Sequence, residues 1–130
     1  MPVNEERLEQ FLQILPKNIF HAFEFRHESW LAESVYQIMR KYGVGLCVFD
    51  MPGFTCPLRA TADFSYIRFH GSAALYSSRY SDREMADWAK RISNLADSNK
   101  LKDVYIYFNN DAEAYAIENA KTISYYLDRK

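Results

Sequence analysis

Short apolar runs alternate along this chain with segments in which apolar residues recur at helical spacing. The runs predict four strands, over Ile19–Phe25, Val44–Phe49, Phe64–Phe69 and Val104–Phe108. The helical spacing predicts helices over Asn4–Leu15, Leu31–Tyr42, the segment that follows Ser81, and Ala112–Leu127. Two segments lack a clear period and are expected to be irregular, a crossover over Asp50–Asp63 and a loop over Gly71–Tyr80.

Local stop and start signals support these helices. Pro16 is expected to end the first helix and Gly43 the second. The third begins with Ser81-Asp82-Arg83-Glu84, a capping box in which the serine hydroxyl and the glutamate carboxylate satisfy free amides of the first turn.

Alternating strands and helices predict an α/β fold of parallel (β/α) units. Four such units can form an open sheet or one half of an eight-stranded barrel. Glu24 with Arg26, and Arg68 with His70, are two residues apart, so each pair points to one face of its strand. Polar pairs suit a barrel lumen near its mouth. We therefore expect a TIM-barrel-like half-barrel of about four βα units, preceded by an N-terminal helix, with residues 1–130 as one domain.

Polar residues gather where the predicted strands end, and in α/β folds the carboxyl ends of the strands are where sites are built. The candidate site residues there are Glu24, Arg26, His27, Asp50, Arg68, His70, Asn109, Asn110 and Asp111. The loop residues Tyr76 and Arg79 are expected at the same rim.

Two interpretations of Arg68 remain open. It either forms a structural ion pair with Glu24 across the barrel interior, or offers its planar fork to a phosphate or carboxylate ligand. His70 is the candidate acid or base, together with Glu24, and otherwise a hydrogen-bonded structural histidine. His27 is a weaker ligand-binding candidate.

The run Asn109-Asn110-Asp111 also has two interpretations. It either caps the last helix, or presents one asparagine to a ligand near the positive end of that helix. Histidines and acidic residues occur at several strand ends, but none has a tight metal-ligand spacing and arginines lie nearby, so no metal and no cofactor is expected.

Composition excludes some partners. Lys and Arg number 16 against 17 Asp and Glu, which gives a net charge of −1 and no general basic field for nucleic acid. No apolar run approaches the roughly 18 to 20 residues of a membrane span. We expect a cytoplasmic protein without membrane contact. Cys47 and Cys56 lack a metal spacing and are expected to be unbridged.

Three motifs also resemble one family. They are Glu24-Phe25-Arg26-His27 with Trp30, then Tyr66-Ile67-Arg68-Phe69-His70-Gly71, then Tyr107-Phe108-Asn109-Asn110-Asp111 with Ala116 and Asn119-Ala120. Their order and spacing resemble the YecE-like family, domain of unknown function 72, from about Leu8 onward. The resemblance implies a TIM-type barrel of roughly twice this length, of which this chain is similar to the C-terminal half.

The resemblance implies no reaction, because the family has no firmly assigned activity. From the residues we expect the rim to bind a small anionic, phosphorylated ligand and, if it is catalytic, to hydrolyse a phosphoester. The alternatives are a nucleic-acid-binding module that uses the loop from Tyr76 to Arg79 and the rim arginines, and a non-catalytic assembly subunit. A half-barrel is further expected to pair with itself or with a separately encoded N-terminal half.

Overall fold

The computed structural model describes residues 1–71, 79–110 and 112–128. Tyr76 and Asp111 lie outside these ranges. The elements in chain order are α1 (Glu5–Gln13), β1 (Ala22–Phe23), η1 (Glu28–Trp30), α2 (Glu33–Lys41), β2 (Gly45–Met51), β3 (Phe54–Thr55), β4 (Phe64–Phe69), α3 (Asp82–Asn99), β5 (Asp103–Phe108), η2 (Ala112–Ala114) and α4 (Tyr115–Leu127).

The sheet has the order β1-β2-β4-β5, and all four of these strands run parallel. In its register Cys47 is opposite Tyr66, and Tyr66 is opposite Tyr105. These residues therefore share one face. Parallel strands joined through helices confirm the predicted α/β class, and the open sheet of four parallel strands is compatible with half of a barrel.

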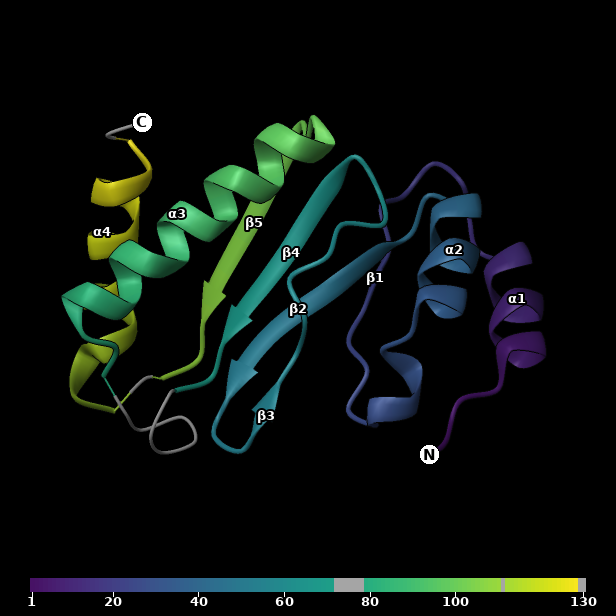
Figure 1. The fold of residues 1–130 in the computed structure, drawn as a ribbon, viewed down its shortest axis with the longest axis horizontal. Helices are drawn as coiled ribbons and strands as arrows, with labels where there is room; N and C mark the ends of the chain where they lie inside the picture. The colour runs from purple at the N-terminus through teal and green to yellow at the C-terminus, as the bar shows by residue number, and fades with distance from the viewer. Residues whose placement is uncertain (72–78, 111, 129–130) are drawn as a thin grey trace.

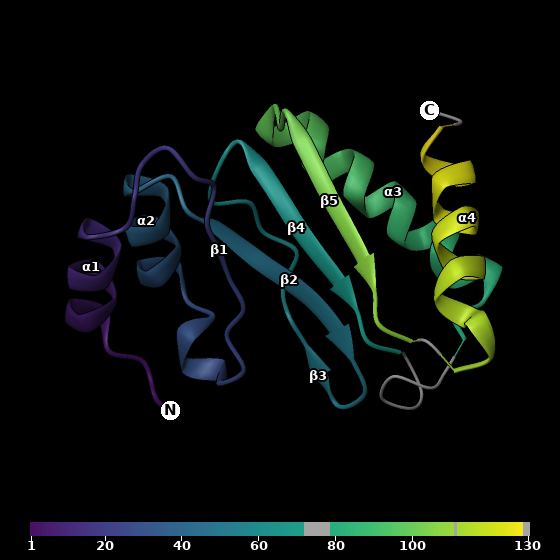
Figure 2. The same ribbon diagram turned by 180° about the vertical axis from the view of Figure 1, so that it is seen from behind.

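Helices cover only one face of this sheet in the described chain. Figure 1 shows α3 in front of β4 and β5, with α1 and α2 packed together beside β1 and β2. Figure 2 shows the same strands from behind, where α3 passes in back of them. The covered face holds the core, in which Phe69 of β4 makes an edge contact with Trp88 of α3 at 5.0 Å between ring centroids.

Local signals set the helix ends. Asn4 caps α1 by accepting a hydrogen bond from the Arg7 amide at 3.0 Å, and the predicted capping box of Ser81 and Glu84 is formed at the start of α3. Gly43 follows α2 with a φ of 66°, a backbone conformation that favours glycine. None of the described helices is long and apolar enough to cross a membrane.

Three predicted boundaries were wrong. The first strand is two residues long instead of Ile19–Phe25, because its pairing with β2 is limited to Ala22 and Phe23. The predicted irregular crossover contains β3, which turns back on the end of β2 as an antiparallel hairpin.

The last helix begins at Tyr115 rather than Ala112. Glu113 and Ala114 have φ values of 53° and 64°, which interrupt the α-helical path before Tyr115. The N-cap residue is Ala114, without a side-chain hydrogen bond, so Asn110 does not cap this helix as one interpretation had it.

Candidate functional site

A cluster of polar side chains lies at the carboxyl ends of the parallel strands. Glu24 and Arg26 follow β1, Arg68 lies near the end of β4, His70 comes directly after β4, and Asn109 directly follows β5. These five residues are called the rim cluster below. Parallel pairing carries all of these strand ends to the same edge of the sheet, which is why Glu24 and Asn109, 85 positions apart in the sequence, both contact Arg68.

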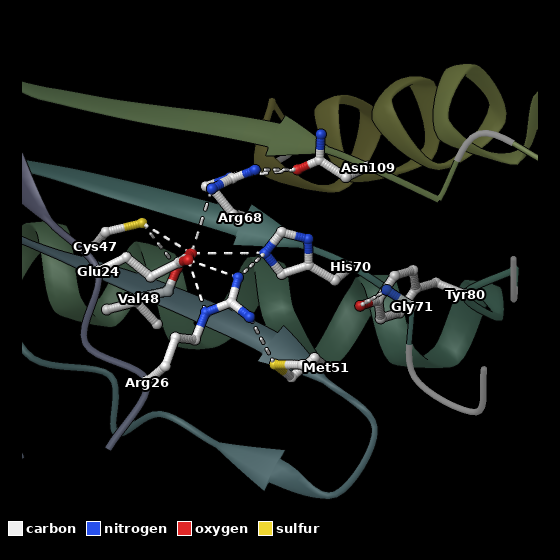
Figure 3. A network of polar contacts seen from close by, with 10 residues as sticks. All are labelled: Glu24, Arg26, Cys47, Val48, Met51, Arg68, His70, Gly71, Tyr80 and Asn109. Carbon is white, nitrogen blue, oxygen red and sulfur yellow. Dashed lines mark hydrogen bonds and ion pairs between the residues drawn. The ribbon is translucent and has the colours of Figure 1, made fainter. Parts of the chain in front are cut away.

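The carboxylate of Glu24 is the centre of the rim cluster (Figure 3). Its Oε2 accepts from Arg26, at 2.6 Å from Nη2 and 2.8 Å from Nε. Its Oε1 lies 3.5 Å from Nη1 of Arg68 and 3.5 Å from Nε2 of His70. One acidic side chain directly after β1 therefore joins two arginines and a histidine, and the expected proximity of Glu24 to Arg68 is present.

Asn109 holds the other side of the Arg68 guanidinium. Its Oδ1 accepts from Nη2 at 3.1 Å and from Nε at 3.3 Å. Arg68 thus bridges β1 and β5 through Glu24 and Asn109, and its side chain remains 32% exposed. A planar guanidinium held at two sides is oriented before any ligand arrives, which reduces the entropy lost on binding.

The charges around Glu24 keep it ionised. Burial alone would raise its pKa, but the hydrogen bond from Arg26 and the positive charges of Arg26 and Arg68 outweigh burial, so the pKa of Glu24 lies below its ordinary value. The carboxylate is anionic at neutral pH and neutralises one of the two arginines.

His70 is completely buried, and burial lowers its pKa. Glu24 opposes this shift, while the charges of Arg68 and Arg26 reinforce it. The ring is therefore neutral at pH 7 and has one N–H group. Its Nε2 lies 3.5 Å from both Glu24 Oε1 and Arg26 Nη2, so it donates to the carboxylate in one tautomer and accepts from the guanidinium in the other.

Asp50 lies on the helix-covered side instead of in the rim cluster. Its Oδ2 accepts a hydrogen bond from the hydroxyl of Tyr80 at 2.8 Å, and the Tyr80 oxygen accepts from the Gly71 amide at 3.0 Å. Burial raises the pKa of Asp50, although the hydrogen bond from Tyr80 opposes the shift. The pair connects the end of β2 to the turn that follows β4.

Asn110 also points away from the rim cluster. Its Nδ2 donates to Oδ1 of Asn119 at 2.8 Å. Asn119 binds the backbone of Tyr80 twice, accepting from its N–H at 3.1 Å and donating to its carbonyl at 2.9 Å. Sequence reasoning missed the structural roles of Tyr80 and Asn119, because only the tertiary fold brings residues 39 positions apart together.

Two further candidates serve local structure. His27 caps η1, its Nδ1 accepting from the Ser29 amide at 3.2 Å. Arg79 lies 3.3 Å from Glu118 of α4, and both side chains are more than half exposed. Among the described residues, neither side chain forms a hydrogen bond or ion pair with the rim cluster. No group of three or more side chains that could hold a metal ion occurs in that part of the chain.

A hollow of about 620 Å³ runs from the rim cluster along the face that the helices leave uncovered. The uncovered face is called the open face below. The residues that line its hollow are Ile19, Phe20, Ala22, Glu24, Cys47, Phe64, Tyr66, Arg68, Tyr105 and Tyr107. The rings of Tyr66 and Tyr107 stack in it at 5.1 Å between centroids. Charged groups occupy one end of the hollow, and aromatic groups form most of the remainder.

The fold and the rim cluster define a class, an α/β protein with parallel (β/α) units and polar side chains at the carboxyl ends of its strands. All of residues 1–130 match the family described as "Protein of unknown function DUF72". The chain belongs to the DUF72 family, which is the family that its motifs resemble.

Relatives of known sequence or structure agree with this assignment. The UPF0759 protein YunF of Bacillus subtilis (strain 168) is 30% identical over 132 residues, which cover 82% of this chain and 46% of that protein. The crystal structure of a DUF72 family protein from Thermotoga maritima matches with a TM-score of 0.80 at 31% identity, over 95% of this chain and 51% of the other.

A DUF72 family protein from Enterococcus faecalis matches with a TM-score of 0.78 at 23% identity, over 98% of this chain and 57% of that one. This last similarity concerns the fold alone. The chain thus spans about half the length of the relatives it matches.

Proposed function

We propose that the rim cluster binds a small anionic ligand that carries a phosphate group. One observation carries the proposal: two guanidinium groups, those of Arg26 and Arg68, share the single carboxylate of Glu24. With His70 neutral, the described residues of the rim cluster carry two positive charges and one negative charge. Both arginines are partly exposed, at 44% and 32%, so a ligand from solvent can reach them.

Phosphate fits this arrangement because guanidinium groups bind its oxygens through paired, charge-assisted hydrogen bonds. Asn109 orients Arg68, and Glu24 competes with the ligand for both arginines. Binding then transfers Arg26 from the carboxylate to the phosphate. Arg26 is the more exposed of the two and lies outside the strands, after the two-residue β1, so we assign it the larger movement.

A finer form of the proposal is that the ligand is a phosphoester that the site hydrolyses. Its support is a neutral imidazole, His70, beside a carboxylate, Glu24. The imidazole accepts a proton from water as the water oxygen bonds to phosphorus and the bond between phosphorus and the ester oxygen breaks. The ester oxygen leaves as an anion that takes its proton from solvent, and the imidazolium returns its proton to solvent. Because His70 is buried, this step requires Arg26, 3.5 Å from its Nε2, to move.

Nucleic acid is the alternative class of ligand. Its support in the sequence was the loop from Tyr76 to Arg79 together with the rim arginines. Within that loop, Arg79 lies 3.3 Å from Glu118, and Tyr76 lies outside the described residues. The described geometry therefore favours the small anion.

Calorimetric titration with inorganic phosphate at low salt tests the proposal. Arg26→Gln and Arg68→Gln each remove a charged donor, worth about 1.5–3 kcal/mol, so phosphate affinity should fall roughly tenfold to a hundredfold. Arg79→Gln is the matched control, because it removes an arginine that also pairs with a glutamate but lies outside the rim cluster.

Equal phosphate affinity in folded rim variants and in the control would overturn the proposal, as would absence of phosphate binding by the unaltered chain. The finer form is tested with 4-nitrophenyl phosphate. Release of 4-nitrophenolate that disappears in His70→Asn supports hydrolysis. Binding of the ester without release rejects hydrolysis and leaves anion binding standing.

A further inference from the structure

The hairpin of β2 and β3 contacts one arginine of the rim cluster (Figure 3). Met51 pairs with Phe54 across the hairpin, and Gly53 between them has a φ of 75°, which suits the reversal of the chain. Nη1 of Arg26 donates to Sδ of Met51 at 3.6 Å, and the Arg26 guanidinium carbon lies 5.0 Å from the centre of the Phe49 ring. The hairpin therefore holds a methionine sulfur against a charged group of the proposed anion site.

The sulfur of Met51 is a weak partner for this arginine. A thioether accepts hydrogen bonds poorly, so Met51 adds little to the ion pair that Arg26 forms with Glu24. Oxidation to the sulfoxide makes the methionine side chain polar and gives it an oxygen that accepts hydrogen bonds. A hydrogen bond from a charged donor to such an oxygen is about twice as strong as a neutral one.

Met51 is one of the two methionines that an oxidant in solution can reach. Met39 and Met85 are fully buried, whereas Met51 is half-buried and Met1 is 70% exposed. In the described part of the chain, Met51 is the methionine whose sulfur accepts a hydrogen bond from the rim cluster. Access and position therefore coincide at Met51.

We propose that Met51 is an oxidation site through which a peroxide regulates anion binding at the rim cluster, an inference that rests on the proposed function. The sulfur lone pair forms a bond to one oxygen of hydrogen peroxide as the bond between the two peroxide oxygens breaks. The proton on the transferred oxygen passes to the departing hydroxide, which leaves as water. The sulfur is thereby oxidised and the peroxide reduced by one electron pair.

The sulfoxide oxygen then replaces the sulfur as the acceptor for Nη1 of Arg26. A small rotation of the flexible methionine side chain brings this oxygen to an ordinary hydrogen-bond distance. Glu24 and the oxidised Met51 together hold Arg26, so phosphate must displace two strong acceptors before this arginine binds it. Oxidation therefore weakens phosphate binding, and sulfoxide reductases reverse the effect.

Peroxide treatment of the folded chain, followed by mass spectrometry of its peptides, tests the first step. Oxygen should be added to Met51 and Met1 before Met39 and Met85. The second step is read without phosphate, from the side-chain N–H groups of Arg26, which should exchange with solvent more slowly after oxidation. Calorimetry should then show phosphate affinity reduced about tenfold, the effect of one added hydrogen bond from a charged donor. Methionine sulfoxide reductases should restore both properties.

Met51→Leu is the matched control, because leucine has a similar volume and no sulfur. It retains Met1 and both cysteines, and the same treatment should change neither its Arg26 exchange nor its phosphate affinity. The inference is overturned by a Met51 that stays unoxidised in the folded chain, by an oxidised Met51 with unchanged Arg26 exchange or phosphate affinity, or by an equal loss of affinity in Met51→Leu.

Failure of the proposed function has a different signature, because the untreated chain then binds no phosphate. The exchange of the Arg26 side chain still decides in that case whether oxidised Met51 holds the arginine.

Discussion

Glu24 and Arg68 lie 3.5 Å apart, from Oε1 to Nη1, although β2 separates their strands in the sheet. Both side chains must therefore project over β2 on the open face to meet. This contact places the carboxylate where it stabilises two arginines, and under the proposed function it also competes with the phosphate for them. The two roles separate when the carboxylate is replaced by its neutral amide.

Glu24→Gln should destabilise the fold and strengthen phosphate binding. The loss of the central charge leaves Arg26 and Arg68 facing each other, at a cost of about 1–2 kcal/mol in the free energy of unfolding after allowance for solvent screening. Removal of the competing anion should improve phosphate affinity about tenfold, or about 1.4 kcal/mol. Urea denaturation and calorimetry measure the two effects.

Glu33→Gln is the control for that variant, because Glu33 also pairs with two arginines but on the exposed surface of α2. It should leave phosphate affinity unchanged. Weaker phosphate binding by Glu24→Gln than by the unaltered chain would contradict competition and would indicate that Glu24 chiefly positions Arg68.

His70 should make the fold sensitive to mild acid. Its folded pKa lies below the unfolded value of about 6.5, so the unfolded chain binds the proton first as pH falls. Stability should be fully present above pH 6.5 and fall below it, by at most about 1.4 kcal/mol per pH unit. Of the nearby carboxylates, Glu24 beside the ring has a pKa below its ordinary value, whereas burial raises the pKa of Asp50 on the helix-covered side.

Urea unfolding at pH 7.5, 6.5 and 5.5 measures this slope, and His70→Asn should flatten it. The arginines that face His70 stay charged throughout this range. A slope that is equally steep in His70→Asn would assign the acid sensitivity to another group.

Tyr80→Phe should cost about 1–3 kcal/mol of stability. The hydroxyl is buried, donates to Asp50 and accepts from the Gly71 amide, so its removal leaves both of these groups without that partner. Thermal or urea denaturation gives the value. Tyr107→Phe removes a hydroxyl from an exposed ring of the open face and should change stability little.

Cys47 and Cys56 should react with thiol reagents only when the chain unfolds. Both are free and buried, and burial, with the nearby charge of Glu24, raises the pKa of the Cys47 thiol to about 12. The pKa of the Cys56 thiol is raised to about 11. Ellman's reagent should label neither cysteine in native buffer and both in denaturant. Rapid labelling of the native chain would show that one of these sites opens readily.

Patterns confined to a few residues predicted this structure well. The capping box of Ser81 and Glu84 depends on one helical turn, and the placement of Glu24 near Arg68 follows from the two-residue alternation of strands together with strand order. Asp50 and Cys47 lie three residues apart in β2, so the same alternation places their side chains on opposite faces of the sheet. Cys47 lines the open face, and Asp50 therefore faces Tyr80 rather than the rim cluster.

Features that depend on distant partners could not be predicted in this way. The length of β1 depends on how many of its residues pair with β2, and the position of Asn110 depends on Asn119 of α4. The pairing of β1 with β2 and the contact of Asn110 with Asn119 both depend on the tertiary fold, and no local sequence pattern marks either of them.

His70 Nε2 lies equally far from a carboxylate oxygen and a guanidinium nitrogen, so under the proposed function its ring would report whether the site is occupied. An anion that draws Arg26 away leaves Glu24 as the partner of that nitrogen and so selects the tautomer protonated there. The two tautomers have distinct nitrogen-15 chemical shifts. Ligand screening can therefore read out one imidazole signal by magnetic resonance, with no knowledge of what reaction, if any, the ligand undergoes.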